Sequence, residues 1–188
     1  RPAHKAKSDN QNTKTDKELK NKERNQNFDH NNLANNVNLG NQSYSRKIRK
    51  LITSDYQPID WQLDFKSGFR WSELTPSGSI LYGHKLGVDI KVPWELARLQ
   101  HLPLIALCAA PNKRATKQSS AILLKKCKLE FMNQSLDFIA SNPPGWGVNW
   151  VCTMDVSIRA INLIIAFNIF AENGTKFEKD FLREFTAS

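Results

Sequence analysis

The sequence predicts an all-α body of antiparallel helical hairpins, preceded by an extended aromatic arm and a basic tail. From residue 89 onward, apolar residues recur with a period of about 3.6, as in a helix that buries one face. Proline and glycine clusters at residues 142–145 and 173–174 divide this part into separate helices. The connections are short, so we expect successive helices to lie antiparallel.

The first 45 residues are expected to form a disordered tail, separate from residues 46–188. Residues 1–50 hold 12 Lys or Arg against 5 Asp or Glu, and the rest of the chain holds 15 against 13. The tail is rich in Asn and poor in apolar residues, so it cannot bury enough surface to offset chain entropy. A basic tail can contact nucleic acid or an anionic surface. We favour a solvated leader and expect no nucleic-acid partner.

A short helix is expected over residues 45–53, followed by an aromatic arm over residues 56–84. In the arm, Trp61 alternates with Asp60 and Gln62 at the period of a strand. The segment is too short and too isolated to imply a sheet domain. We therefore expect an extended chain that lies across the helical body.

Four helical segments are expected in the body. The first begins near residue 89 and should bend or end at Pro103, because a proline inside a helix removes a hydrogen bond. The second is expected over about residues 116–140, the third over about 153–172 and the fourth from about 176 onward. The sequence shows no internal repeat, but this rhythm of hairpins suits a toroid or a solenoid.

Trp94, Glu95 and Arg98 form the first group of candidate binding residues, because spacings of three and four place them on one helical face. An indole ring stacks on the apolar face of a sugar, and an arginine fork holds a carboxylate through two hydrogen bonds. The alternative is a surface ion pair between Glu95 and Arg98 beside a core tryptophan. Spacing alone leaves both interpretations open.

Asn149, Trp150 and Arg159 form the second group. The prolines and glycines of residues 143–147 predict a rigid loop that presents Asn149 and Trp150 at the start of an apolar helix. Asn149 could present its amide to a substrate, or it could hydrogen-bond the loop. Arg159 could line a site, or it could form an ion pair with Asp155 one turn earlier and brace a neighbouring loop.

The sequence lacks the patterns of several other kinds of site. It has no glycine-rich phosphate loop, no His-Glu-x-x-His motif and no Gly-x-Ser-x-Gly motif. The spacing of its three cysteines matches no metal site, so we expect no metal and no cofactor. The longest apolar run, residues 158–170, is interrupted by polar residues, and we expect no membrane span.

An ordered series of motifs runs through residues 56–188. The motifs are Ile59-Asp60-Trp61, Asp64-Phe65-Lys66-Ser67-Gly68, Asp89-Ile90-Lys91, Trp94-Glu95, Arg98, Asn142-Pro143-Pro144, Asn149-Trp150 and Ser157-Ile158-Arg159-Ala160-Ile161-Asn162. Each motif alone is weak, but in this order they resemble the N-terminal part of heparinase II/III-like polysaccharide lyases. The resemblance implies an (α/α) toroid followed by a β-sandwich domain. Residues 46–188 would then be an incomplete toroid.

The resemblance implies cleavage of a uronic-acid-containing polysaccharide by β-elimination. In this chemistry an amide or imidazole polarises the uronate carboxylate, and a Tyr or His moves the protons. The family takes these groups from an Asn-His motif and from later residues, and this chain contains no Asn-His pair. We therefore expect the catalytic residues to lie C-terminal to Ser188, and residues 1–188 alone to be inactive.

The same resemblance implies an anionic polysaccharide as partner and a location in the periplasm or cell envelope. Six residues become candidates for the wall and subsites of the binding site: Trp94, Glu95, Arg98, Asn149, Trp150 and Arg159. The alternative function is a non-catalytic helical protein that binds carbohydrate or assists assembly in polysaccharide biosynthesis. An Asn-His pair and a strand-rich region beyond residue 188 would favour the lyase.

Overall fold

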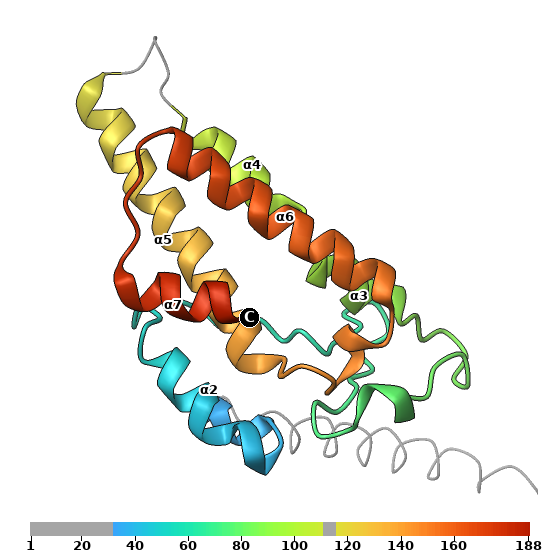
Figure 1. The fold of residues 1–188 in the computed structure, drawn as a ribbon. Helices are drawn as coiled ribbons and strands as arrows, with labels where there is room; N and C mark the ends of the chain where they lie inside the picture. Colours follow the sequence, from blue (N-terminus) through green and yellow to red (C-terminus); the bar gives the residue numbers. More distant parts are fainter. Residues whose placement is uncertain (1–31, 111–115) are drawn as a thin grey trace, which may run out of the picture.

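The computed structural model describes residues 32–110 and 116–188, and this part of the chain is built of helices (Figure 1). Its α-helices are α2 Gln42–Arg49, α3 Lys91–Ala97, α4 His101–Cys108, α5 Lys117–Ser141, α6 Thr153–Glu172 and α7 Lys179–Ala187. In these residues β-structure is limited to two isolated bridges, between Leu63 and Arg70 and between Pro76 and Trp146. The predicted all-α class is confirmed for the described residues.

The predicted tail falls only partly within the described residues. Residues 1–31 lie outside them, whereas residues 32–45 are folded. Residues 32–45 form two 3₁₀ turns, η1 Leu33–Asn36 and η2 Leu39–Asn41, and the first half of α2. Ala34 and Val37 are buried, and η1 contacts α5. The boundary predicted at residue 45 is therefore too late, because these two small apolar side chains anchor a polar segment against α5.

The helix expected over residues 45–53 is α2, which begins and ends earlier than predicted. After it, residues 54–90 contain no α-helix, as expected of the arm, and their one 3₁₀ turn is η3, Ser77–Ser79. Trp61 is 1% exposed and meets the ring of Phe138 edge to face, with 5.2 Å between centroids. The arm thus contributes to the core.

The first helical segment breaks before Pro103. α3 ends at Ala97, and Leu99 has a φ of 56°, in the left-handed region that residues with a side chain rarely adopt. Leu99 is fully buried, so its core contacts offset this strain. Pro103 is the third residue of α4, where the missing N–H is not needed. The prediction that Pro103 bends or ends the helix is wrong, because Pro103 lies in a first turn.

The predicted boundaries of the last three helices lie close to the observed ones, and capping residues explain two of them. Thr116 caps α5, and its hydroxyl accepts a hydrogen bond from the Ser119 N–H at 3.1 Å. α6 spans the predicted residues and is followed by Gly174, which has a φ of 76°. α7 begins at Lys179, slightly later than predicted.

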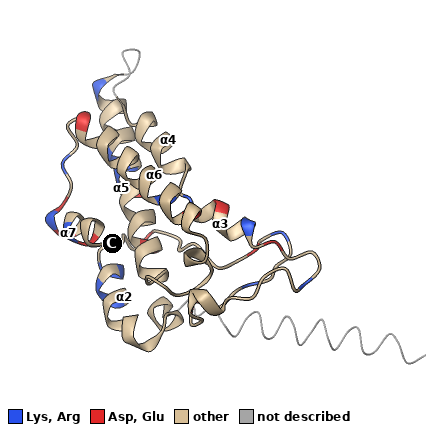
Figure 2. Ribbon diagram, turned by 45° about the vertical axis from the view of Figure 1, so that its right-hand side comes forward, with Lys and Arg blue, Asp and Glu red and all other residues tan. Residues whose placement is uncertain are grey.

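The successive helices α4, α5 and α6 alternate in direction, as the hairpin prediction requires. In Figure 1, α4 and α6 run side by side towards the same end of the molecule, and α5 runs back. α4 packs on α5 and α6, and α2 and α7 pack on α5. A cluster of rings fills the core between α5, α6 and α7: Phe131, Phe167, Phe170, Phe177, Phe181 and Phe185. Basic residues of α2 lie near α7 (Figure 2), where Lys47 Nζ pairs with Glu184 Oε1 at 2.8 Å.

α6 is apolar on its outer side as well as its inner side. The exposed apolar residues here are Met154, Ile161, Ile164 and Ile165 on α6 and Leu104 and Leu107 on α4. By length and composition, α6 is the one helix of the described residues that is apolar enough to cross a membrane. Core helices of other proteins pass the same test, and α6 carries the buried charges Asp155 and Arg159. The expected absence of a membrane span stays a prediction.

Candidate functional site

A loop precedes α6, and its shape depends on Gly147. This residue has a φ of 75°, and a Cβ added to it would lie 2.8 Å from Gln62 Oε1. Gln62 lies so close because its Oε1 accepts a hydrogen bond from the Val148 N–H at 2.9 Å. Only glycine meets both demands, of conformation and of space. The short helix η4, Val148–Trp150, then leads into α6.

Buried amide groups hold this loop against the arm. Asn142 Oδ1 accepts hydrogen bonds from Gln62 Nε2 at 2.9 Å and from Asn149 Nδ2 at 2.8 Å. Asn149 Nδ2 also donates to the Trp61 carbonyl at 2.8 Å. Asn149 is 1% exposed, so its amide braces the loop, which is one of the two roles that the sequence leaves open.

Trp94 and Glu95 lie on α3, next to the loop, and Arg98 is the residue that caps the C-terminal end of this helix. Trp94 Nε1 donates to the Val148 carbonyl at 2.8 Å, which ties α3 to η4. The Trp94 ring is partly exposed, and it meets the exposed Tyr82 ring with 6.1 Å between centroids. Glu95 is exposed as well. This face of α3 presents two aromatic rings beside charged side chains, and we call it the α3 face.

Arg98 pairs with Asp155 at the start of α6. Its Nε lies 2.5 Å from Asp155 Oδ1, and its Nη1 lies 4.0 Å from Glu95 Oε1. The side chain of Asp155 is 2% exposed and that of Arg98 is 20% exposed. The sequence allows an ion pair between Asp155 and Arg159 within α6. In the structure Asp155 bonds Arg98 instead, because α3 packs against α6.

Arg159 is a buried cation held by backbone carbonyls. It is 3% exposed and donates to the carbonyls of Ala97 and Asn149, each at 3.2 Å. Its guanidinium carbon lies 4.4 Å from the centroid of the Phe138 ring and 5.1 Å from that of Trp150. Burial lowers the pKa of Arg159 to about 10. The side chain therefore remains a cation at neutral pH.

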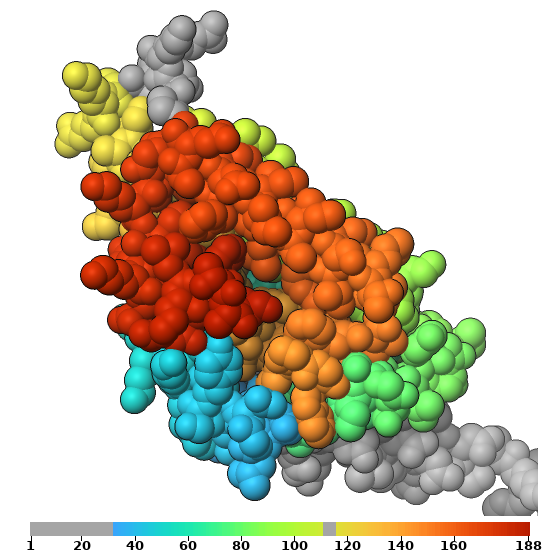
Figure 3. Space-filling view, in the orientation of Figure 1, coloured from blue at the N-terminus to red at the C-terminus, as the bar shows by residue number. Residues whose placement is uncertain are grey.

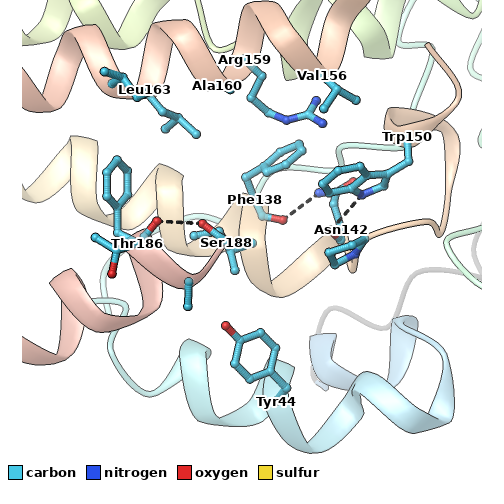
Figure 4. Close-up of a pocket in the computed structure, with 15 residues that line it drawn as sticks. Tyr44, Phe138, Asn142, Trp150, Val156, Arg159, Ala160, Leu163, Thr186 and Ser188 are labelled. Atoms are coloured by element: carbon cyan, nitrogen blue, oxygen red, sulfur yellow. Dashed lines mark hydrogen bonds between the residues drawn. The ribbon is translucent and has the colours of Figure 1, made fainter. Parts of the chain in front are cut away.

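Arg159 and Trp150 line a cavity of about 480 Å³ between α2, α5, α6 and α7. Figure 3 shows the hollow at the surface, and Figure 4 shows Arg159 and Trp150 towards one end of it and Leu163 and Thr186 towards the other. Its apolar walls include Phe138, Ile139, Val156, Leu163, Ile164 and Phe185. Trp94, Glu95 and Arg98 do not line this cavity.

The six predicted residues thus belong to one network but face two surfaces. Arg159 joins the network, because it bonds both the end of α3 and η4. Sequence reasoning missed Gln62 and Asn142 as bracing groups and Tyr82 as part of the α3 face. In the sequence, Asn142 has the pattern of a helix stop before two prolines, and Gln62 that of a polar position in a strand-like alternation. Neither pattern identifies a partner.

Comparisons with models of known families, with curated proteins and with solved structures found no match to this chain. Among the described residues, no group of three or more His, Cys, Asp or Glu side chains is arranged to hold a metal ion.

Proposed function

We propose that this chain is part of a lyase that cleaves uronic-acid-containing polysaccharide by β-elimination. Residues 46–188 would contribute the N-terminal part of an (α/α) toroid. The alternating directions of α4, α5 and α6 support this proposal, since a toroid is a ring of helical hairpins. The apolar residues exposed on α4 and α6 support it too, because further hairpins of a toroid would bury them.

The α3 face is the proposed polysaccharide-binding surface. Tyr82 and Trp94 present rings to solvent, and such rings stack on the apolar faces of sugars. Arg98 directly follows α3, with its Nε bonded to Asp155 and its Nη1 at 4.0 Å from the exposed Glu95, so Nη2 is the terminal nitrogen left for a uronate carboxylate. This combination of a ring pair with a partly exposed cation is the observation that carries the proposal.

Asn149 and Arg159 act in this proposal as positioning residues. Arg159 links the end of α3 to η4, and Asn149 links η4 to the arm. These contacts hold Trp94 at a fixed distance from the loop, since Trp94 donates to the Val148 carbonyl. A binding face needs this kind of rigid support. Trp150 lies on the other side of the network and lines the cavity.

The proton-transfer groups of the proposed reaction are expected beyond Ser188. β-Elimination needs a base for the C5 proton and an acid for the leaving oxygen. Arg98 can hold a carboxylate, but an arginine side chain stays protonated and is no base at neutral pH. We therefore propose that residues 1–188 bind an anionic polysaccharide without cleaving it, with no metal or cofactor, in the periplasm or cell envelope.

A non-catalytic helical protein that binds carbohydrate or assists polysaccharide assembly is the second candidate. It is favoured by the internal contacts of Asn149 and Arg159, which give two residues of the motif series a bracing role. Such contacts would serve equally in a protein that lacks catalytic groups. Both candidates use the α3 face, and they differ in whether cleavage follows binding.

Calorimetric titration with oligogalacturonate and with a neutral oligosaccharide of the same length tests the α3 face. We expect the anionic ligand to bind more tightly. Arg98→Lys and Trp94→Phe should each weaken it by about tenfold, as loss of a charge-assisted hydrogen-bond fork or of a large stacking ring requires. Lys91→Met, which removes an exposed charge from the same helix, is the control and should leave the affinity unchanged.

Equal affinity for the neutral oligosaccharide, or unchanged affinity in both variants, would contradict the proposal. A longer chain that extends past Ser188 then separates the two candidates. It should produce an unsaturated uronide, followed by its ultraviolet absorbance, if the protein is a lyase. Tight binding without any product in that chain would favour the non-catalytic candidate.

A further inference from the structure

The cavity between α2, α5, α6 and α7 has the composition of a binding site for a different class of ligand. Its volume of about 480 Å³ lies in the usual range of small-molecule sites. Of the described residues that line it, Arg159 is the one with a charged side chain. Most of the others are aliphatic or aromatic, and α6 contributes Val156, Leu163 and Ile164. The cavity therefore combines one cation with a largely apolar wall.

No carboxylate of the described residues is bonded to Arg159, although the charge of Asp155 one turn earlier favours its charged form and opposes the effect of burial on its pKa. Among the described residues, Asp155 bonds Arg98, and no ion pair includes Arg159. A guanidinium has five N–H donors, and two of those in Arg159 reach the carbonyls of Ala97 and Asn149. The other three make no hydrogen bond with the described residues. A buried cation of this kind gains strongly from an anion that supplies the missing acceptors.

The arrangement of the walls indicates the shape of that ligand. In Figure 4, the Arg159 side chain points between Phe138 and Trp150 at one end, and Leu163 projects into the space along α6. Most of the lining is apolar, so a sugar in this cavity would lose more hydrogen bonds to water than the few polar lining groups could replace, which is costly. A hydrocarbon would gain from the same walls. Tyr44, Thr186 and Ser188 also line the cavity. Among the described residues of the lining, however, Arg159 has the one charged side chain, so the charge of the ligand is placed at Arg159.

We propose that this cavity binds an amphipathic organic carboxylate, with the carboxylate on Arg159 and the hydrocarbon body along α6 and Phe185. The proposal goes beyond the polysaccharide-binding face and does not depend on it, since no residue of α3 lines the cavity. Arg159 serves both surfaces, because one of its donors holds the end of α3, another holds η4, and its side chain also lines the cavity.

Octanoate is the probe, with octanamide and glucuronate as matched controls, in calorimetric titrations of the whole chain. Octanamide keeps the hydrocarbon and removes the charge, whereas glucuronate keeps the carboxylate and removes the hydrocarbon. We expect octanoate to bind, and the affinity of each control to be lower by a factor of about ten or more, since a charge-assisted hydrogen bond or a buried alkyl chain is lost. Failure of octanoate to bind, or a control that matches its affinity, would overturn the proposal.

Ala160→Phe tests the place of binding without removing a hydrogen bond of Arg159. Ala160 lines the cavity, and a phenyl group there would occupy space that octanoate needs. Ile161→Phe is the control, because Ile161 is exposed and does not line the cavity. With wild-type circular dichroism in both variants, octanoate binding should be lost in the first and kept in the second. Unchanged affinity in Ala160→Phe would overturn the proposal.

Discussion

Asp137 on α5 and Arg159 on α6 are both buried charges, but their surroundings differ. Asp137 is fully buried, and its carboxylate accepts hydrogen bonds from the side chains of Arg49, Tyr56, Trp61 and Ser141 and from the Ile59 N–H. Arg159 bonds two carbonyls and, among the described residues, no carboxylate. A charge whose partners all come from the protein belongs to the scaffold. A charge with spare donors at a cavity wall is available to a ligand.

The partners of Asp137 come from segments far apart in the sequence, so this carboxylate joins α2 and the arm to α5. Burial raises the pKa of Asp137, and its hydrogen bonds and the charge of Arg49 oppose that rise. Burial, and then the charge of Asp137, also raises the pKa of Tyr56, so the phenol stays protonated and donates. We therefore expect changes at Asp137 to affect stability most, and changes at Arg159 to affect binding.

Asp137→Ala should cause the largest loss of stability. It leaves several buried donors without an acceptor and Arg49 without its counter-ion. We expect the free energy of unfolding to fall by about 3–5 kcal/mol, the range for breaking a buried ion pair, measured by urea denaturation. Asp137→Asn keeps one acceptor oxygen and should lose clearly less. A loss below about 1 kcal/mol in Asp137→Ala would contradict this prediction, because exposed ion pairs contribute as much.

Arg159→Met should cost less, although the residue is almost as deeply buried. The loss of two charge-assisted hydrogen bonds is partly offset, because an unpaired charge no longer has to be buried. We expect a fall of about 1–3 kcal/mol in the free energy of unfolding by the same measurement. If Arg159→Met destabilises the protein as much as Asp137→Ala does, Arg159 is a scaffold residue like Asp137.

Tyr56→Phe removes one donor from Asp137 and leaves the rest in place. We expect a loss of about 0.5–1.5 kcal/mol in urea denaturation, the usual net contribution of one hydrogen bond. Tyr82→Phe removes an exposed hydroxyl and should leave the stability unchanged. A loss as large as that of Asp137→Ala would mean that the donors of Asp137 act as a unit.

Glu184 on α7 provides a third, weaker case, because its partner Lys47 has a side chain that is 54% exposed. The hydrogen bond from Lys47 lowers the pKa of Glu184 below its ordinary value of 4.5, although burial opposes the shift. The resulting stability is present above pH 4.5 and is lost as the pH falls through the lower folded pKa. The difference in unfolding free energy between wild type and Glu184→Gln should follow this course, with an amplitude of about 1 kcal/mol or less. A difference that stays constant with pH would contradict it.

The sequence predicted local features of this fold better than contacts between distant segments. The C-terminal end of α6 followed from Asn173 and Gly174, whose conformational preferences act within one turn. The position of the break before α4 did not follow from Pro103, because the effect of a proline depends on where the helix starts. The buried cation on α6 could be anticipated from one Arg in an apolar helix. Its lack of a carboxylate could not, because Asp155 is taken by Arg98 from another helix.

The hydrogen-bond partners of Asp137 could not be predicted from the sequence either. It lies between Leu136 and Phe138 in an apolar stretch of α5, and a single carboxylate in such a stretch is a signal of a buried network. Its donors Tyr56 and Trp61 lie about 80 residues away, at separations of 81 and 76. Periodicity within one helix carries no information on such partners.

The break at Leu99 fixes the register of α6 against α4. In an unbroken helix the carbonyls of Ala97 and Arg98 would accept N–H groups one turn later. The break frees them, and they accept from Arg159 at 3.2 Å and from Asn162 at 2.9 Å. The core residues of α4 and α6 are otherwise apolar, and along apolar side chains a helix could slip by a turn of about 5.4 Å with little change in buried area. The strained conformation of Leu99 thus frees two carbonyl acceptors, and the hydrogen bonds to them disfavour the slipped alignments.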